Sequence, residues 1–211
     1  MAGVAASVCV RQPDRRWNHN THYYPRVLAA VPPGCERALD VGCGEGMLAR
    51  QLTGLVEQVT GIDEHEPSIE LARQQSLSRG DEFIVGDFLA YPFPAESFGL
   101  ISSVAALHHM DAGAALARMK QLLAPGGRLV VIGLARSELP DLPSDVAATV
   151  VNLGYRLARG YWEHPSPIMW PPPHTYRQIG ALAKATLPGV SCRRLLMWRY
   201  LLTWAKPQFS T

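Results

Sequence analysis

Strand and helix patterns alternate along the chain from residue 36 to residue 134, and this alternation limits the possible folds more than any other feature. Short apolar segments typical of strands lie at residues 37–41, 58–62, 82–85, 99–105 and 128–134. Helical patterns lie between several of them, at residues 47–55, 67–78 and 111–124. Alternating strands and helices favour parallel pairing with helices on both faces of the sheet. The pattern predicts an α/β fold with a doubly wound, mostly parallel sheet.

A glycine-rich turn follows the first expected strand. Residues 38–46 read Ala-Leu-Asp-Val-Gly-Cys-Gly-Glu-Gly, with Asp40 near the strand end and Gly42 and Gly44 in the turn. Glycine has no side chain to keep a ligand away from the backbone. In open parallel sheets, ligands bind beyond the carboxyl ends of the strands. We therefore expect the functional site at this turn.

Acidic residues stand at three successive strand ends, namely Asp40, Asp63 and Asp87. A carboxylate offers two acceptor oxygens, so Asp63, with Glu64 beside it, suits the vicinal hydroxyls of a ribose. Asp87 can accept a hydrogen bond from an exocyclic amine, and the adjacent Phe88 can pack on a purine ring. A single acid of this kind is often only a helix N-cap or a solvated loop residue. Three of them after a glycine turn favour a nucleoside site.

Five segments in this order resemble the class I S-adenosylmethionine-dependent methyltransferases. They are residues 39–46, the Gly-Ile-Asp of 61–63, the Gly-Asp-Phe of 86–88, the Phe-Pro-Ala-Glu-Ser-Phe-Gly-Leu-Ile of 93–101, and the Leu-Leu-Ala-Pro-Gly-Gly-Arg-Leu of 122–129. The resemblance implies an enzyme that uses S-adenosyl-L-methionine as cofactor. It also implies a Rossmann-like sheet of seven strands, because residues 190–197 and 200–205 resemble the family's closing antiparallel hairpin.

The resemblance also implies roles for individual residues. Asp40, Gly42, Cys43 and Gly44 would contact the methionyl part of the cofactor. Asp63 and Glu64 would lie at the ribose, although many relatives have an apolar residue in place of Glu64. Asp87 and Phe88 would contact the adenine, and the backbone of Ser103 and Val104 would lie near the cofactor's amino group.

Two segments outside these motifs are expected to cover the acceptor. Residues 1–35 would form an N-terminal arm and lid helix, with His22, Tyr23 and Tyr24 in a polar and aromatic cluster. Residues 36–211 would form the methyltransferase domain, with a proline-framed insertion at about 135–173 that contains Trp162. A helix is expected at 144–159 within this insertion. For both segments the alternative is simple packing: aromatics that pin the arm to the core, and a helix that lies flat on the sheet.

His108 and His109 directly follow the fourth expected strand. Imidazole titrates near neutral pH, so either residue is a candidate general base for a hydroxyl or phenol. His22 and Tyr23 are second candidates for the acceptor site. Alternatively, the His-His pair only caps its loop or holds Asp111.

Composition excludes several classes of function. The net charge of +2 over 211 residues is too small for a nucleic-acid-binding protein, and no apolar run reaches the roughly 18 residues of a membrane span. The first basic residue is Arg11, so no signal peptide is expected and the protein is assigned to the cytoplasm. The four cysteines show no zinc-like spacing, so we expect reduced thiols and no metal. The oligomeric state is left open.

The acceptor is expected to be a small molecule, because residues 102–105 read Ser-Ser-Val-Ala and lack the Asn-Pro-Pro-Tyr motif common in methyltransferases of base amino groups. The neighbouring histidines favour O-methylation. Two other classes stay open. An NAD-dependent oxidoreductase would show a Gly-x-Gly-x-x-Gly fingerprint, whereas this turn reads Gly-x-Gly-x-Gly. A non-catalytic methyltransferase-like binding protein would keep the fold without turnover.

Overall fold

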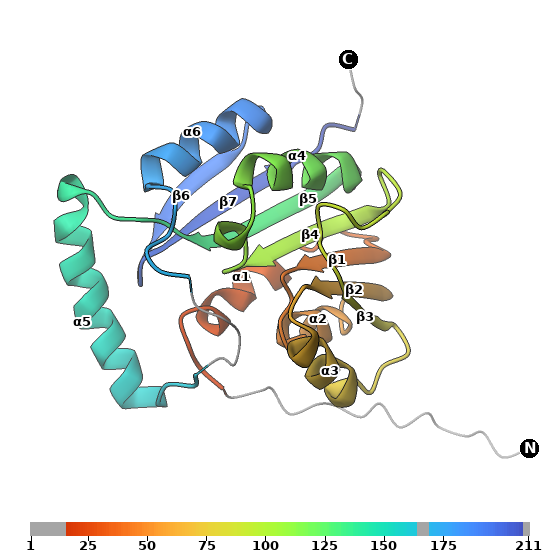
Figure 1. The fold of residues 1–211 in the computed structure, drawn as a ribbon, viewed down its shortest axis with the longest axis horizontal. Helices are drawn as coiled ribbons and strands as arrows, with labels where there is room; N and C mark the ends of the chain where they lie inside the picture. The colour runs from red at the N-terminus through yellow and green to blue at the C-terminus, as the bar shows by residue number, and fades with distance from the viewer. Residues whose placement is uncertain (1–15, 164–168, 209–211) are drawn as a thin grey trace, which may run out of the picture.

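Seven strands form one sheet in the order β3-β2-β1-β4-β5-β7-β6, in the computed structural model that describes residues 16–163 and 169–208 (Figure 1). The first five strands pair in parallel, and β7 pairs antiparallel with both β5 and β6. The predicted seven-stranded sheet with a C-terminal antiparallel hairpin is therefore confirmed. The strands are β1 (Arg37–Val41), β2 (Gln58–Asp63), β3 (Asp81–Val85), β4 (Phe98–Val104), β5 (Leu123–Leu134), β6 (Ser191–Leu195) and β7 (Arg199–Ala205).

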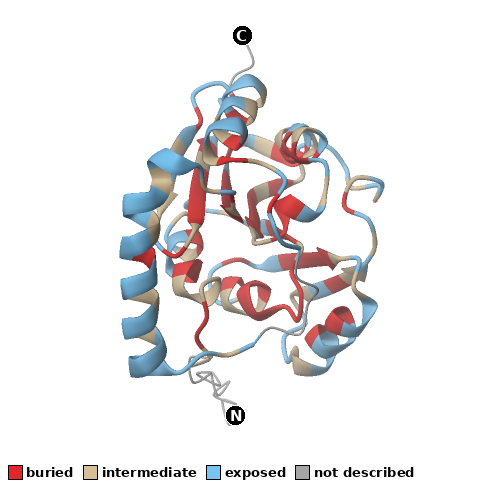
Figure 2. Ribbon diagram, turned by 60° about the vertical axis from the view of Figure 1, so that its left-hand side comes forward, coloured by how far each residue is buried: buried red, intermediate tan, exposed pale blue. Residues whose placement is uncertain are grey.

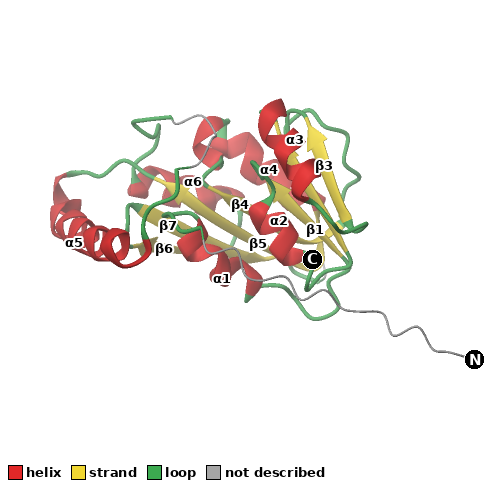
Figure 3. Cartoon of the chain, turned by 90° about the horizontal axis from the view of Figure 1, so that it is seen from below, coloured by secondary structure: helices red, strands yellow, loops and turns green. Residues whose placement is uncertain are grey.

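Helices cover both faces of this sheet (Figure 3). One apolar cluster packs residues of α4 and α6 against the strands, and a second packs residues of α1, α2 and α3 against the opposite face. The helices are α1 (Tyr24–Leu28), α2 (Met47–Leu52), α3 (Glu66–Gln75), α4 (Ala112–Leu122), α5 (Leu142–Arg159) and α6 (Tyr176–Thr186), with short 3-10 turns η1 (Thr21–Tyr23), η2 (Leu107–His109) and η3 (Leu139–Asp141). None of the helices in the described residues is long and apolar enough to cross a membrane.

Several predicted boundaries were wrong by a few residues. Helix α2 ends at Leu52, before the expected end at residue 55, and Leu55 is 55% exposed. Helix α4 begins after Asp111, which caps it, since its carboxylate accepts a hydrogen bond from the backbone N–H of Ala114.

Residues 125–127, between the expected helix at 111–124 and the expected strand at 128–134, lie inside strand β5. Leu123 pairs with Phe98, but the next pair joins Leu100 to Arg128, so the chain between them bulges out of the ladder. Gly126 takes a positive φ of 76° in this bulge and donates its backbone N–H to Lys206. The glycines thus bend the strand without ending it.

Helix α5 forms close to the predicted bounds, but the expectation that it might lie flat on the sheet is wrong. Figure 2 shows it largely exposed, and Ala148 is its one buried residue. Its inward side is polar and aromatic: Asn152 forms a hydrogen bond of 2.7 Å with His19, and Tyr155 stacks on Trp17. The apolar stripe faces outward and consists of Val146, Val150, Leu153 and Leu157.

The N-terminal arm is held between α5 and the β6–β7 turn. Trp17 is buried and accepts a hydrogen bond from the backbone N–H of Trp162. The Tyr23 hydroxyl donates to the carbonyl of Leu196, at 2.7 Å. Residues far apart in the sequence are thereby brought to one end of the sheet.

Candidate functional site

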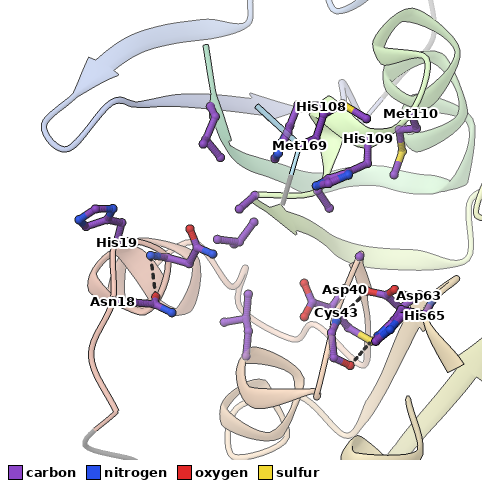
Figure 4. Close-up of a pocket in the computed structure, with 18 of the residues that line it drawn as sticks. Asn18, His19, Asp40, Cys43, Asp63, His65, His108, His109, Met110 and Met169 are labelled. Carbon is purple, nitrogen blue, oxygen red and sulfur yellow. Dashed lines mark hydrogen bonds between the residues drawn. The ribbon is translucent and has the colours of Figure 1, made fainter. Parts of the chain in front are cut away.

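A cavity of about 710 Å³ opens at the carboxyl edge of the parallel strands. The ends of four strands line it, through Asp40 of β1, Asp63 of β2, Val104 of β4 and Leu134 of β5. Such a volume suits a ligand of cofactor size or a ligand pair. In Figure 4, Asp40, Cys43 and Asp63 lie together on one side, His108 and His109 lie on another, and Asn18 and His19 lie apart from both.

The glycine turn after β1 forms one wall of the cavity. Gly42, Gly44 and Gly46 all have positive φ, at 70°, 52° and 73°. A Cβ on Gly42 would lie 2.1 Å from the Cβ of Ala106, so no side chain fits there. The backbone N–H of Gly44 donates to Oδ2 of Asp63, at 2.9 Å, which joins the turn to the end of β2.

Asp40 is buried beneath this turn. Oδ1 of Asp40 accepts a hydrogen bond of 2.8 Å from the Ser102 hydroxyl. Burial, opposed by the Ser102 bond and aided by the charge of the nearby Asp63, raises the pKa of Asp40 to about 7. Burial also raises the pKa of the neighbouring Cys43 thiol. A cation that reached Asp40 would restore its charged form.

Asp63 is fixed by backbone donors on both oxygens. Oδ2 accepts from Gly44, and Oδ1 accepts from the backbone N–H of His65, also at 2.9 Å. Each carboxylate oxygen can accept a further hydrogen bond, so the group is oriented and still available to a ligand. Glu64 also lines the cavity, with its side chain exposed.

The acid and the aromatic residue of the Gly-Asp-Phe motif after β3 differ in position. Phe88 is 3% exposed and lines the cavity, as does the preceding Gly86. Asp87 is exposed and lies outside the lining, and its carboxylate accepts the backbone N–H of Leu89. The Gly-Asp-Phe motif therefore presents its aromatic ring, and not its acid, to the cavity.

After β4, Val104 lines the cavity, whereas the adjacent Ser103 is buried outside the lining. His108 and His109 follow in η2 with ring centroids 4.2 Å apart, and both line the cavity. The two rings therefore meet the cavity beside the glycine turn.

The histidines differ in environment. His108 is 8% exposed, and its Nδ1 has no hydrogen-bond partner among the described residues. Burial, aided by the charges of His109 and Arg199, lowers its pKa to about 4. His109 is exposed; burial lowers its pKa, and Asp63 opposes this change. His108 is therefore neutral at pH 7, and its Nδ1 is a buried ring nitrogen without a partner among the described residues.

Among the arm and insertion residues selected from the sequence, Tyr24 lines the cavity. His22, Tyr23 and Trp162 do not. His22 packs edge-on against Tyr23, with ring centroids 4.7 Å apart, and the Trp162 ring lies beneath the Arg16 guanidinium. These three side chains hold the arm in place.

Many lining residues were not among the site residues selected from the sequence. The turn and its surroundings contribute Leu48, Ile62, His65, Gly86, Ala105, Ala106, Met110 and Leu134, and the arm, the insertion and the hairpin contribute Asn18, His19, Asn20, Tyr161, Glu163, Met169, Trp170, Trp198 and Arg199. Asn18, His19 and Asn20 belong to the polar and aromatic cluster that was expected to form a lid, although they were not selected individually. Nothing in the hairpin pattern indicates Arg199. Within the described ranges, no group of three or more His, Cys, Asp or Glu residues could hold a metal ion.

Known proteins resemble the chain in sequence and in fold. The family model described as "Methyltransferase domain" matches residues 39–131. An uncharacterized methyltransferase of Mycobacterium tuberculosis (strain ATCC 25618 / H37Rv) is 38% identical over 199 residues, which cover 92% of this chain and 99% of the relative. The O-methyltransferase cnsE of Penicillium expansum is 39% identical, over 53% of this chain and 43% of its own.

A solved structure with the same fold is that of the Haemonchus contortus phosphoethanolamine N-methyltransferase 2 in complex with phosphomonomethylethanolamine and S-adenosylhomocysteine. It superposes with a TM-score of 0.64 at 18% identity, over 89% of this chain and 53% of the other. At this identity the likeness concerns the fold alone.

Proposed function

The chain belongs to the class I S-adenosylmethionine-dependent methyltransferases, and on this premise we propose that it transfers the methyl group to a small-molecule acceptor, with oxygen the favoured nucleophile. One observation carries the proposal. A single cavity of about 710 Å³ is lined both by the glycine turn with Asp63 and by the two histidines. This shared lining supports a donor site and an acceptor site within one cavity.

The chemistry of the lining fits S-adenosylmethionine. The glycine backbone leaves room for close approach, Asp63 has acceptor oxygens held in place, and Phe88 offers a buried ring. We assign the ribose to Asp63, with Glu64 beside it, and the adenine to Phe88. Asp87 would reach the adenine only from outside the present lining.

The methionyl part is assigned to the other end of the turn. Asp40, Gly42, Cys43 and Gly44 line the cavity there, and the backbone at Ser103 and Val104 lies on the neighbouring strand β4. A cationic amino group near Asp40 would stabilise the carboxylate against the burial that raises its pKa.

The bound cofactor supplies a methyl group already activated by its sulfonium charge. The chain's own residues therefore have to hold the acceptor in line and exclude water. With the cofactor bound, transfer of its methyl group to an acceptor oxygen would leave the sulfur neutral, so the lining residues would have to take up only the hydroxyl proton. We propose that His108 or His109 accepts this proton.

His108 is the stronger of the two candidates. Its ring is neutral at pH 7, and Nδ1 is buried without a partner among the described residues. An acceptor hydroxyl would supply the missing hydrogen bond. The neighbouring His109 also lines the cavity and is more exposed, so it is retained as the alternative base.

We also propose that the described parts of two segments form the acceptor cover, namely the arm at 1–35 and the insertion at about 135–173. Residues 1–15 of the arm and 164–168 of the insertion lie outside the described residues. Asn18, His19 and Asn20 of the arm line the cavity, as do Tyr161 and Trp170 of the insertion. His19 and Asn152 link the two segments directly.

The experiment that tests this function measures S-adenosylhomocysteine released from S-adenosylmethionine in the presence of a library of small hydroxyl compounds, amines and carbon acids. Acceptor-dependent release with hydroxyl compounds is expected. Release that occurs only with amines or carbon acids would contradict the O-methylation assignment. Cofactor binding without release for any acceptor, nucleic acids included as controls, would favour a non-catalytic binding protein.

A further inference from the structure

Arg199 is a buried cation in the wall of the cavity. It is the first residue of β7, directly after the β6–β7 turn, and only 6% of it is exposed. Burying a guanidinium without a counter-charge costs free energy. The partners of Arg199 therefore show whether its charge and its N–H donors are satisfied within the described residues.

The partners of Arg199 within the described residues are neutral. Nη1 donates to the carbonyl of Met197 at 3.2 Å, and Nη2 donates to Oδ1 of Asn20 at 2.8 Å. These bonds use two of the five N–H donors of the guanidinium, and Nε has no partner. Glu163 lines the same cavity, but no ion pair joins it to Arg199.

The cation remains charged at neutral pH. Burial lowers the pKa of Arg199 to about 10, and the phenols of Tyr161, Tyr23 and Tyr176 oppose this change. Because phenols are uncharged at pH 7, they provide no counter-ion. The positive charge therefore stands uncompensated within the described part of the chain.

Arg199 lies at the acceptor end of the cavity. Its partner Asn20 follows His19, and its charge lowers the pKa of both His19 and His108. Figure 4 shows His19 and Asp63 on opposite sides of the space. A group bound to Arg199 would thus sit away from the nucleoside wall and near the candidate base.

We propose that the methyl acceptor carries an anionic group, a carboxylate or a phosphate, that binds the Arg199 guanidinium and directs the nucleophile toward His108. This assignment rests on the proposed methyltransferase function and narrows its acceptor class. The planar guanidinium suits both anions, since either can accept two parallel hydrogen bonds. Bound to Arg199, the anion supplies the counter-charge that the described residues lack.

A second consequence concerns His108. The Arg199 charge is one cause of its low pKa, so an anion on Arg199 would raise the pKa of His108 and make the ring a stronger base. The base would gain strength only when an anionic acceptor is in place.

The test is a titration of the full chain, saturated with S-adenosylhomocysteine, with benzoate, phenyl phosphate and the neutral benzyl alcohol at constant ionic strength. We expect benzoate or phenyl phosphate to bind at least tenfold more tightly than benzyl alcohol. Arg199→Met removes this preference, and Arg199→Lys retains part of it. Arg193→Met is the matched control, because Arg193 is exposed on the same hairpin and lies outside the cavity lining. It keeps the full preference.

The pKa of His108 gives a second measure of anion binding that needs no variant. Its pKa, followed by NMR in the wild-type protein, rises when benzoate or phenyl phosphate binds and not when benzyl alcohol is added. Equal binding of the charged and neutral probes by the wild type would overturn the proposal, even if Arg199→Met fails to fold. A folded Arg199→Met that loses more than tenfold in affinity for S-adenosylhomocysteine would also overturn it, because Arg199 would then serve the cofactor. Failure of the wild type to bind S-adenosylhomocysteine would instead contradict the proposed function.

Discussion

Asp40 and Ser102 face each other across strands β1 and β4, where the Ser102 hydroxyl donates a 2.8 Å hydrogen bond to the buried Asp40 carboxylate. The pair lies directly beneath the glycine turn. It explains how an acid can stand at the base of the cavity without a cationic partner, because burial raises the Asp40 pKa to about 7 and the acid is partly neutral.

This raised pKa predicts a pH-dependent stability. The folded protein holds the Asp40 proton more tightly than the unfolded chain, whose pKa is 3.8, so the stabilisation is complete below pH 3.8 and is lost as the pH rises through about 7. Relative to Asp40→Asn, the cofactor-free wild type should lose on the order of 4 kcal/mol of unfolding free energy between pH 4 and pH 8. Urea unfolding across this range measures the difference.

The comparison with Asp40→Asn is needed because the titration of His108 changes the unfolding free energy with pH in the opposite direction. Its folded pKa of about 4 lies below the ordinary 6.5, so its contribution to stability falls as the pH drops from 6.5 toward 4. Both proteins carry His108, and its effect cancels in the difference. Parallel stability curves for the two proteins would show that Asp40 is not the titrating group.

Gly42 is expected to tolerate no side chain. Gly42→Ala forces an L-residue to a φ of 70° and places its Cβ 2.1 Å from that of Ala106. We expect a loss of about 3 kcal/mol or more in unfolding free energy, with weakened S-adenosylhomocysteine binding. Gly189→Ala is the control, since Gly189 has a φ of 82° but no neighbour within 4 Å of the added Cβ. It should cost about 1–2 kcal/mol and leave binding intact; equal losses at both positions would refute the role of the Ala106 contact.

The histidines should affect turnover and not cofactor affinity. If His108 is the base, His108→Ala lowers kcat for a hydroxyl acceptor by about 10²–10⁴ and leaves the Kd for S-adenosylhomocysteine within about twofold. His109→Ala should lower kcat far less. A reversed order would assign the base to His109, and a folded variant that loses cofactor affinity would place the histidine in the cofactor site.

The outward stripe of α5 should contribute little to stability. Val150→Ser and Leu157→Ser replace side chains that are 66% and 80% exposed, so each should change the unfolding free energy by less than about 0.5 kcal/mol. Ala148→Asp on the same helix buries a charge and should cost several times more. Thermal unfolding of the three variants separates these cases; similar losses in all three would mean that the stripe is packed in solution.

The sequence predicted well those features that local chemistry determines. Strand and helix patterns predict the sheet, and the glycine turn with Asp63 marks its ligand edge, because these residues lie at the strand ends. The bulge at Gly126 was not predicted, because two adjacent glycines after a proline are also typical of a turn. Only the pairing of Leu123 with Phe98 shows that the strand begins before them.

The proposed acceptor end of the cavity could not be predicted from local sequence patterns. It is assembled from segments far apart in the chain, such as Asn20 and Arg199, which are 179 positions apart. No local pattern encodes that contact, because tertiary packing of the arm against the hairpin creates it. For the same reason the sequence selected His22, which supports the arm, and missed His19, which lines the cavity.

A crystal structure of the protein with S-adenosylhomocysteine tests the central claim most directly. We predict the ribose hydroxyls at Asp63, the adenine against Phe88, the amino group near Asp40, and the sulfur facing the space bounded by His108 and Arg199. A ligand whose sulfur points away from that space, or one bound outside the cavity, would contradict it.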